Sequence, residues 1–173
     1  MKKIVIISGT LNNNYKLSKN IGDILIDLGV TVSVLSLENY MLPLYTDKVF
    51  KEKQDEYRAT VLSLINKLKE SKGLIFCAPE YNGSIPPILS NFIAWLSISG
   101  DDFRNLFNGQ PIAIATFSGG IGLELLTSLR IQLVHLGSQV LGRQLLSSYS
   151  KPIDTKTIED IIQRLLQMKK LKT

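Results

Sequence analysis

The chain has 173 residues, of which 45% are hydrophobic, and its formal net charge is +5 with a single cysteine, Cys77. This size suits one domain spanning residues 1–173, and one cysteine excludes both an internal disulfide and a metal site built from cysteines alone. The basic residues are mixed with acidic ones or gathered near the C-terminus, which argues against a nucleic-acid partner and favours a solvated face.

The apolar runs of the chain are short. None approaches the roughly 18 residues of a membrane span, so we expect a cytoplasmic protein without a membrane partner. Short runs rich in β-branched residues are typical of buried strands. In chain order, we expect strands at residues 3–7, 30–35, 74–78, 112–117 and 138–141. Apolar residues at helical spacing predict helices at residues 17–28, 57–72, 86–96, 122–136 and 158–166. A polar stretch with Pro43 and Asp47 separates the second strand from its helix.

This alternation of strands and helices indicates the fold class. Continuously apolar strands linked by helices predict an α/β protein whose five-stranded parallel sheet is covered on both faces. Right-handed crossovers bring the strand-to-helix loops together at the carboxyl edge of the sheet. Ligands of such proteins bind at that edge, where the strand order reverses. The candidate functional residues are therefore those of the strand-to-helix loops.

The loop after the first strand, residues 8–18, is rich in hydroxyl and amide side chains and opens a helix. Such a loop presents side-chain donors and free backbone N–H groups to an anion, helped by the helix dipole. It has neither the Walker A spacing nor a G-x-G-x-x-G pattern. Ordinary helix capping accounts for the same residues equally well, so the residues alone leave phosphate binding open.

The loops after the third and fourth strands carry glycines. Residues 79–87 place Tyr81 and Gly83 directly after a strand end, where a tyrosine ring and an open backbone could meet a flat ligand. Residues 116–122 contain three glycines in four positions, which leaves backbone N–H groups bare for ligand oxygens. Without a ligand, residues 79–87 could equally be a proline-framed turn with a helix cap, and residues 116–122 could be a tight turn.

Taken together, these loops resemble a known family. The block Pro79-Glu80-Tyr81-Asn82-Gly83-Ser84-Ile85-Pro86, followed by Leu89, Asn91 and Trp95, is similar to the signature P-E-Y-N-x-S-I-P-x-x-L-K-N-x-x-D-W of NAD(P)H-dependent FMN reductases. That family includes chromate, quinone and azo reductases. The resemblance covers almost the whole chain in the order and spacing of its elements. It implies a flavodoxin-like three-layer sandwich with a parallel sheet in the order 2-1-3-4-5.

The resemblance also implies which residues bind the cofactor. The first loop would hold the FMN phosphate through Ser8, Thr10, Leu11, Asn12, Tyr15, Leu17 and Ser18. The second loop would pack on the isoalloxazine ring through Pro79, Glu80, Tyr81, Asn82 and Gly83. The third would contact the pyrimidine side or the ribityl chain through Ser118, Gly119 and Gly120. The family usually has an arginine about where Asn12 stands, a lysine at Ser90, an aspartate at Ala94 and a glycine at Pro87.

The function implied by the resemblance is an oxidoreductase. NAD(P)H would pass a hydride to bound FMN, and the electrons would continue to a small acceptor such as a quinone, azo compound, metal oxyanion or flavin. No catalytic acid or base and no metal are expected, and the family implies a homodimer or homotetramer. Two alternatives remain open, a flavodoxin-type electron carrier and a flavin-free binding module on the same fold.

Three side chains outside this scheme could carry chemistry. Cys77 lies in an apolar run and is predicted to be a small buried hydrophobe rather than a redox thiol. His135 lies in an apolar helix and is predicted to be a packed residue rather than a general base. For Glu80 we expect a structural or capping role.

Overall fold

The computed structural model describes residues 3–99 and 102–171. Its parallel sheet has the order β2-β1-β3-β4-β5, and a further short strand, β6, also pairs with β4. The strands are β1 (Lys3–Ser8), β2 (Thr31–Ser36), β3 (Gly73–Cys77), β4 (Pro111–Phe117), β5 (Gln139–Val140) and β6 (Leu145–Ser147). The predicted parallel α/β sheet and its order are therefore confirmed.

The fifth position of the sheet differs from the prediction. One strand was expected at residues 138–141, but two short strands share this edge. β5 pairs with Pro111 and Ile112, whereas β6 pairs with residues 115–117 further along β4. Between them the polar sequence Gly142-Arg143-Gln144 breaks the apolar run. The Arg130 guanidinium supports this break by donating to the carbonyl oxygen of Leu141 at 2.8 Å.

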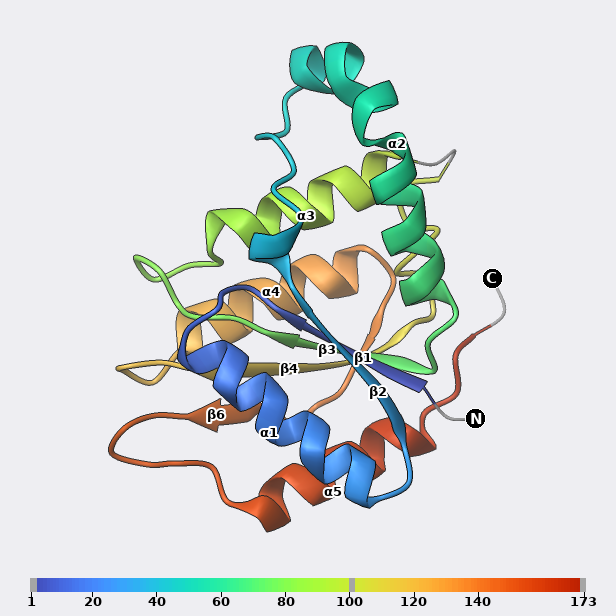
Figure 1. Cartoon of the computed structure of the whole chain (residues 1–173). Coiled ribbons are helices and arrows are strands. Elements are labelled where there is room, and N and C mark those ends of the chain that lie inside the picture. Colours follow the sequence, from blue (N-terminus) through green and yellow to red (C-terminus); the bar gives the residue numbers. More distant parts are fainter. Residues whose placement is uncertain (1–2, 100–101, 172–173) are drawn as a thin grey trace.

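Helices cover both faces of the sheet (Figure 1). They are α1 (Asn13–Asp27), η1 (Leu37–Asn39, a short 3₁₀ helix), α2 (Asp47–Lys69), α3 (Pro87–Ile98), α4 (Leu123–His135) and α5 (Thr155–Gln167). One apolar cluster joins α1 and α5 to one face of the sheet, and a second joins α2, α3 and α4 to the other. None of the helices in the described residues is long and apolar enough to cross a membrane.

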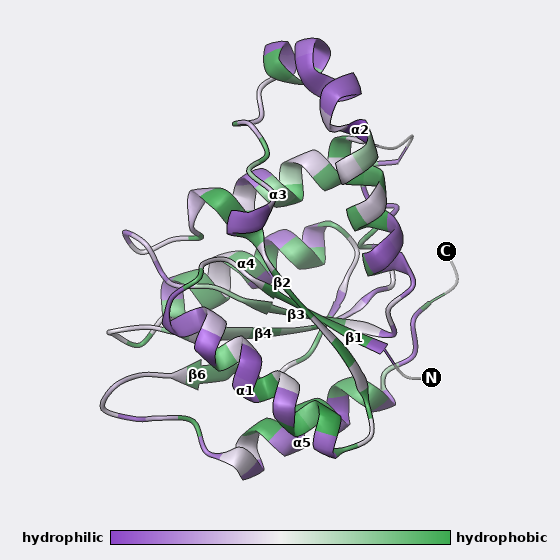
Figure 2. Cartoon of the chain, viewed as in Figure 1, coloured by the Kyte–Doolittle hydropathy of each residue, from purple (hydrophilic) through white to green (hydrophobic). Residues whose placement is uncertain are grey.

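The second helix begins at Asp47, ten residues before the apolar spacing that predicted it. Thr46 caps it, since its hydroxyl accepts a hydrogen bond from the Val49 N–H at 3.1 Å. The added turns are mostly charged and exposed, as the hydrophilic upper end of α2 in Figure 2 shows. Only Val49 and Phe50 of these turns pack against the core, and two neighbouring apolar residues set no helical period, which is why the sequence pattern missed the segment.

The two clusters account for the buried strands. Side chains alternate across a strand, so Val5 and Ile7 of β1 enter one cluster while Ile4 and Ile6 enter the other. All five residues of β3 are buried. Burial on both faces fixes the register of β1, β3 and β4, and therefore the positions of their carboxyl ends.

Candidate functional site

The loops that follow β1, β3 and β4 meet at the carboxyl edge of the sheet and are tied together by hydrogen bonds. The Gly9 N–H donates to the Cys77 carbonyl oxygen at 2.8 Å, which joins the first loop to the end of β3. The Thr116 hydroxyl donates to the Ala78 carbonyl oxygen at 2.7 Å, which joins the end of β4 to the second loop. The three predicted loops therefore lie at one site.

The side chains of the first loop are occupied by the loop itself. The Ser8 hydroxyl donates to the Thr10 carbonyl oxygen at 2.7 Å, and the Thr10 hydroxyl donates to Asn12 Oδ1 at 2.6 Å. Asn12 caps α1 by accepting from the Asn14 N–H at 3.1 Å. Within the described residues, the backbone N–H groups of Thr10, Asn12 and Asn13 donate to no protein acceptor. What the loop offers a ligand is therefore its backbone at the start of a helix.

One carboxylate lies at this loop. Glu38 of η1 accepts a hydrogen bond from the Leu11 N–H at 2.7 Å. The contact uses one of the loop's donors and brings a negative charge to its rim. The Leu11 side chain itself is half exposed.

Two residues predicted for the first loop lie elsewhere. Leu17 is packed in the cluster between α1, α5 and the sheet. Ser18 is fully buried, and its hydroxyl donates to the Asn14 carbonyl oxygen at 2.8 Å. Both sit one turn inside α1, so their side chains do not face the loop. Tyr15 is half-buried with the Lys19 ammonium over its ring at 5.8 Å.

The second loop contains a tight hairpin at its exposed tip. Tyr81 and Ser84 exchange backbone hydrogen bonds of 3.1 and 3.0 Å, and both residues between them have positive φ, 50° at Asn82 and 65° at Gly83. Two left-handed residues with the sequence Asn-Gly are typical of a type I′ turn. Gly83 is therefore required by the turn itself, and the turn holds Tyr81 at the surface, 44% exposed.

Glu80 joins the second loop to the helix that follows the third. Its Oε2 accepts a hydrogen bond from the Leu125 N–H, in the first turn of α4, at 3.2 Å. A carboxylate near a helix N-terminus also interacts favourably with the helix dipole. The structure therefore places Glu80 as a cap, as expected.

The third loop is open at its glycines. Gly119 and Gly120 are exposed, and a Cβ at either position would meet no atom within 4 Å. Ser118 is buried, and its hydroxyl accepts from the Gly120 N–H at 3.2 Å. In the part of the chain that the structure describes, the N–H groups of Gly119 and Ile121 have no acceptor.

Sequence reasoning missed two side chains at this edge. Tyr149, from the loop after β6, packs edge-on against Phe117 with ring centroids 4.9 Å apart, and its hydroxyl accepts from Asn13 Nδ2 at 2.7 Å. Asn14 is 1% exposed, and its amide binds both backbone groups of Phe117. Three consecutive asparagines at a helix start could have drawn attention to Asn14, whereas no pattern connects Tyr149 to a loop 136 residues away.

The model of the family described as NADPH-dependent FMN reductase matches residues 2–151. The chain belongs to this family. It is 34% identical to a quinone reductase of Escherichia coli over 104 residues, which is 59% of this chain and 53% of that protein. The chain therefore spans about half the length of this curated relative.

Solved structures support the fold of this family member. The flavoenzyme NAD(P)H:(acceptor) oxidoreductase FerB of Paracoccus denitrificans superposes with a TM-score of 0.73, at 22% identity and 97% coverage of both chains. An archaeal flavodoxin superposes with a TM-score of 0.64, at 16% identity, over 97% of this chain and 96% of its own. The fold is thus shared by reductases and by a flavodoxin, so it does not separate the two.

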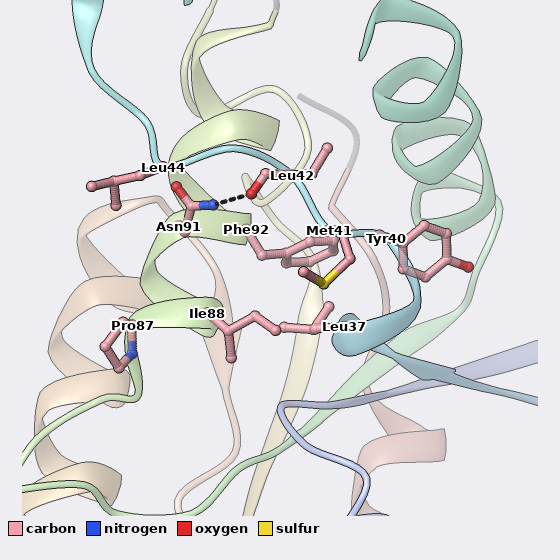
Figure 3. A pocket seen from close by; sticks show the side chains of 9 residues that line it. All are labelled: Leu37, Tyr40, Met41, Leu42, Leu44, Pro87, Ile88, Asn91 and Phe92. Carbon is pink, nitrogen blue, oxygen red and sulfur yellow. Dashed lines mark hydrogen bonds between the residues drawn. The ribbon is translucent and has the colours of Figure 1, made fainter. Parts of the chain in front are cut away.

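An apolar hollow of about 230 Å³ lies beside the second loop of this FMN reductase family member (Figure 3). It lies between residues 37–44 and the start of α3, and its lining includes Leu37, Met41, Ile88 and Phe92. The Asn91 amide, which is in the family signature, holds the loop above it. Nδ2 donates to the carbonyl oxygens of Leu42 and Pro43, each at 3.1 Å, and Oδ1 accepts from the Tyr45 N–H at 2.7 Å.

Trp95, also in the signature, adds a further contact, since its Nε1 donates to the Pro43 carbonyl oxygen at 2.7 Å. A second hollow, of about 630 Å³, adjoins Gly119 and Gly120 and extends toward the start of α5. The site is therefore flanked by an apolar hollow on the α3 side and a larger one on the β6 side.

The remaining reactive side chains lie away from the exposed loops. Burial raises the pKa of the Cys77 thiol from 9.0 to about 12, so the thiolate is disfavoured and the side chain is a buried hydrophobe, as expected. His135 was predicted to be a packed residue. It is instead exposed at the last turn of α4, where it stacks on Phe103. Among the described residues, no group of three His, Cys, Asp or Glu side chains could hold a metal ion.

Proposed function

We propose that this protein is an NAD(P)H-dependent oxidoreductase of the FMN reductase type, built as a single domain that binds FMN at the carboxyl edge of its sheet. Hydride would come from NAD(P)H, and the electrons would leave to a small acceptor. The observation that carries the proposal is the meeting of three loops, each with unpaired backbone N–H groups, at one edge of the sheet. The family to which the chain belongs agrees with it.

The donors at this edge suit the oxygens of FMN. Thr10, Asn12 and Asn13 offer N–H groups at the start of α1, where a phosphate would also meet the positive end of the helix dipole. The first turn of α1 contains no acidic residue that would oppose it. Backbone donors and the dipole would therefore bind the phosphate without the family's arginine.

The second and third loops suit a flat ring. Asn82 and Gly83 of the hairpin also have backbone N–H groups without an acceptor in the described residues. Tyr81 is exposed beside them, and the open glycines at 119 and 120 let a ring approach the backbone closely. We assign the ring to Pro79–Gly83 and its pyrimidine edge or ribityl chain to Ser118–Gly120.

The chain's own residues have a limited chemical task in this reaction. A bound FMN supplies the electron chemistry, because it takes a hydride from nicotinamide and gives electrons to the acceptor. The hairpin and the glycine loop orient the ring, and their N–H dipoles stabilise negative charge on its oxygens. No side chain is required as a general acid or base.

The decisive experiment is flavin binding followed by turnover. Protein freed of flavin should take up FMN on titration, with quenched flavin fluorescence, and should then oxidise NADH or NADPH when a quinone is added. Protein that remains without flavin at saturating FMN would overturn the proposal in favour of a flavin-free binding module. Protein that binds FMN but does not oxidise NAD(P)H would be a flavodoxin-type carrier.

The same assay identifies the acceptor and the nicotinamide. Rates with a quinone, an azo dye, chromate and free flavin, each at matched concentration, rank the acceptors by kcat/KM. The ratio of kcat/KM for NADPH and NADH reports whether the 2′-phosphate is recognised. Initial-rate patterns for a flavin that shuttles between two substrates should be ping-pong.

We also propose that the protein forms a homodimer or homotetramer. Met41 and Leu44 are 75% and 72% exposed at the rim of the apolar hollow beside the second loop. Exposed apolar side chains around such a hollow are typical of a surface that another molecule covers. A second copy of the chain is the occupant we propose.

A further inference from the structure

The ends of β1 and β4 are not neighbours in the sheet, yet one side chain joins them. β3 lies between the two strands, so no ladder hydrogen bond connects the loop after β1 to the loop after β4. Asn14 bridges this distance. Its Nδ2 donates to the Phe117 carbonyl oxygen at 2.9 Å, and its Oδ1 accepts from the Phe117 N–H at 2.7 Å.

The bridge is rigid and defined. Asn14 is 1% exposed, and its backbone carbonyl oxygen accepts from the Ser18 hydroxyl at 2.8 Å and from Cys77 Sγ at 3.2 Å. The two partners of its amide also fix the amide orientation, because a backbone N–H only donates and a carbonyl oxygen only accepts. Asn14 therefore sits over the end of β3 in one conformation.

The two segments that Asn14 joins are the outer parts of the site. Asn14 directly follows the free N–H groups of Asn12 and Asn13, and Phe117 directly precedes Ser118, Gly119 and Gly120. We infer that Asn14 is a positioning residue that holds the phosphate-binding loop and the glycine loop, Ser118–Gly120, at one fixed separation. This inference rests on the proposed function, since it concerns how FMN gains affinity from both loops.

A fixed separation of the loops should raise the affinity for FMN, because its phosphate and its ring are two linked ends of one ligand. When one end is bound, the effective concentration of the other end at its own loop is high only if the spacing of the loops matches the ligand. A bridge that fixes the spacing also removes the cost of ordering the loops on binding. Losing the bridge should therefore weaken FMN, which has a phosphate, much more than riboflavin, which lacks it.

The test compares these two ligands in two variants. Asn14→Leu keeps the volume of the side chain and Asn14→Ser shortens it, and neither retains both hydrogen bonds to Phe117. Asn20→Ala is the matched control, because Asn20 is an exposed asparagine of the same helix whose side chain makes no hydrogen bond in the described structure. Dissociation constants for FMN and riboflavin are measured by flavin fluorescence, and amide exchange of Phe117 is measured in the flavin-free protein.

We expect both Asn14 variants to bind FMN at least about 10-fold more weakly and riboflavin within about 3-fold of wild type, with faster exchange at Phe117. Asn20→Ala should leave the ratio of the two dissociation constants within about 2-fold of wild type. Parallel losses for both flavins would assign Asn14 a general structural role and overturn the inference, as would no loss for either. Wild-type protein that binds neither flavin would instead overturn the proposed function.

Discussion

At the residue scale, the burial of Cys77 makes stability depend on alkaline pH. The thiol has a pKa of about 12 when folded and 9.0 as its ordinary value, so the folded state retains a proton that the unfolded state loses as pH rises. Its contribution to stability is complete below the unfolded pKa and decreases above it. The loss should be about 1.4 kcal/mol per pH unit between the two pKa values.

The measurement is urea unfolding of wild type and Cys77→Ala between about pH 8 and about pH 10. The alanine variant is less stable at the lower pH because it leaves a small cavity, but it lacks the thiol's titration. The difference between the two proteins should therefore shrink as pH rises. A constant difference across the range would contradict a protonated, buried thiol.

Glu38 is expected to weaken the binding of FMN. Its carboxylate accepts from the Leu11 N–H at the rim of the first loop, where a bound phosphate would be repelled by it. Glu38→Gln keeps an accepting oxygen and removes the charge. We expect FMN to bind about 2- to 5-fold more tightly at low salt, with less gain at high salt and no gain for riboflavin.

Isothermal titration at two salt concentrations checks this expectation. Asp27→Asn is the control, since it removes the same charge at the other end of α1. Equal gains in the two variants would point to net charge rather than to a phosphate at the first loop.

At the scale of elements, α3 controls the conformation of the loop before α2. The Asn91 amide makes three hydrogen bonds to the backbone of residues 42–45, and they replace the regular partners that this loop lacks. Asn91→Ala should lower the free energy of unfolding by about 1–3 kcal/mol, because it leaves the Tyr45 N–H and the Leu42 carbonyl oxygen unpaired, whereas the Pro43 carbonyl oxygen keeps its bond from Trp95. Amide exchange at Tyr45 should become faster.

Chemical denaturation and hydrogen exchange give both readouts. Ser90→Ala, one position earlier on α3, is the control because the Ser90 side chain has no contact of this kind in the described structure. Unchanged exchange at Tyr45 in Asn91→Ala would show that the loop keeps its conformation without the amide.

Helices and strands differ in how well their sequence patterns predicted them. β1, β3 and β4 are buried on both faces, so their apolar runs predicted them within a residue or two. The first turns of α2 are mostly exposed and bring only Val49 and Phe50 to the core, and β6 is three residues long, so neither produces an apolar period or run. A sequence pattern predicts a helix or strand only where most of its residues, or one whole face of it, are buried in the core.

At the scale of the whole molecule, the proposed second copy should depend on the apolar rim beside α3. Leu44→Glu places a charge in that rim and should convert an oligomer to the 19.3 kDa monomer. Ile26→Glu is the control, because Ile26 is also exposed but lies on α1, on the opposite face of the sheet. Light scattering coupled to gel filtration measures the mass.

A wild-type protein that is monomeric at all concentrations would contradict the homo-oligomer. An oligomer that Leu44→Glu leaves intact would move the interface to another surface.

The sequence by itself determined the fold class, the strand order through its family signature and the loops at which to look. These follow from local features: apolar runs, helical spacing and a contiguous motif from Pro79 to Pro86. It could not show that the hydroxyls of Ser8 and Thr10 turn into their own loop, or that Leu17 and Ser18 are buried.

Only the tertiary structure decided how the loops are joined. Asn14 and Phe117 are 103 residues apart, Glu80 and Leu125 are 45 apart, and Asn13 and Tyr149 are 136 apart. Each contact depends on parallel crossovers that bring distant loops to one edge of the sheet. The physical reason is that a side chain's partner is set by the packing of whole elements, whereas a sequence pattern reports only which residues must be buried.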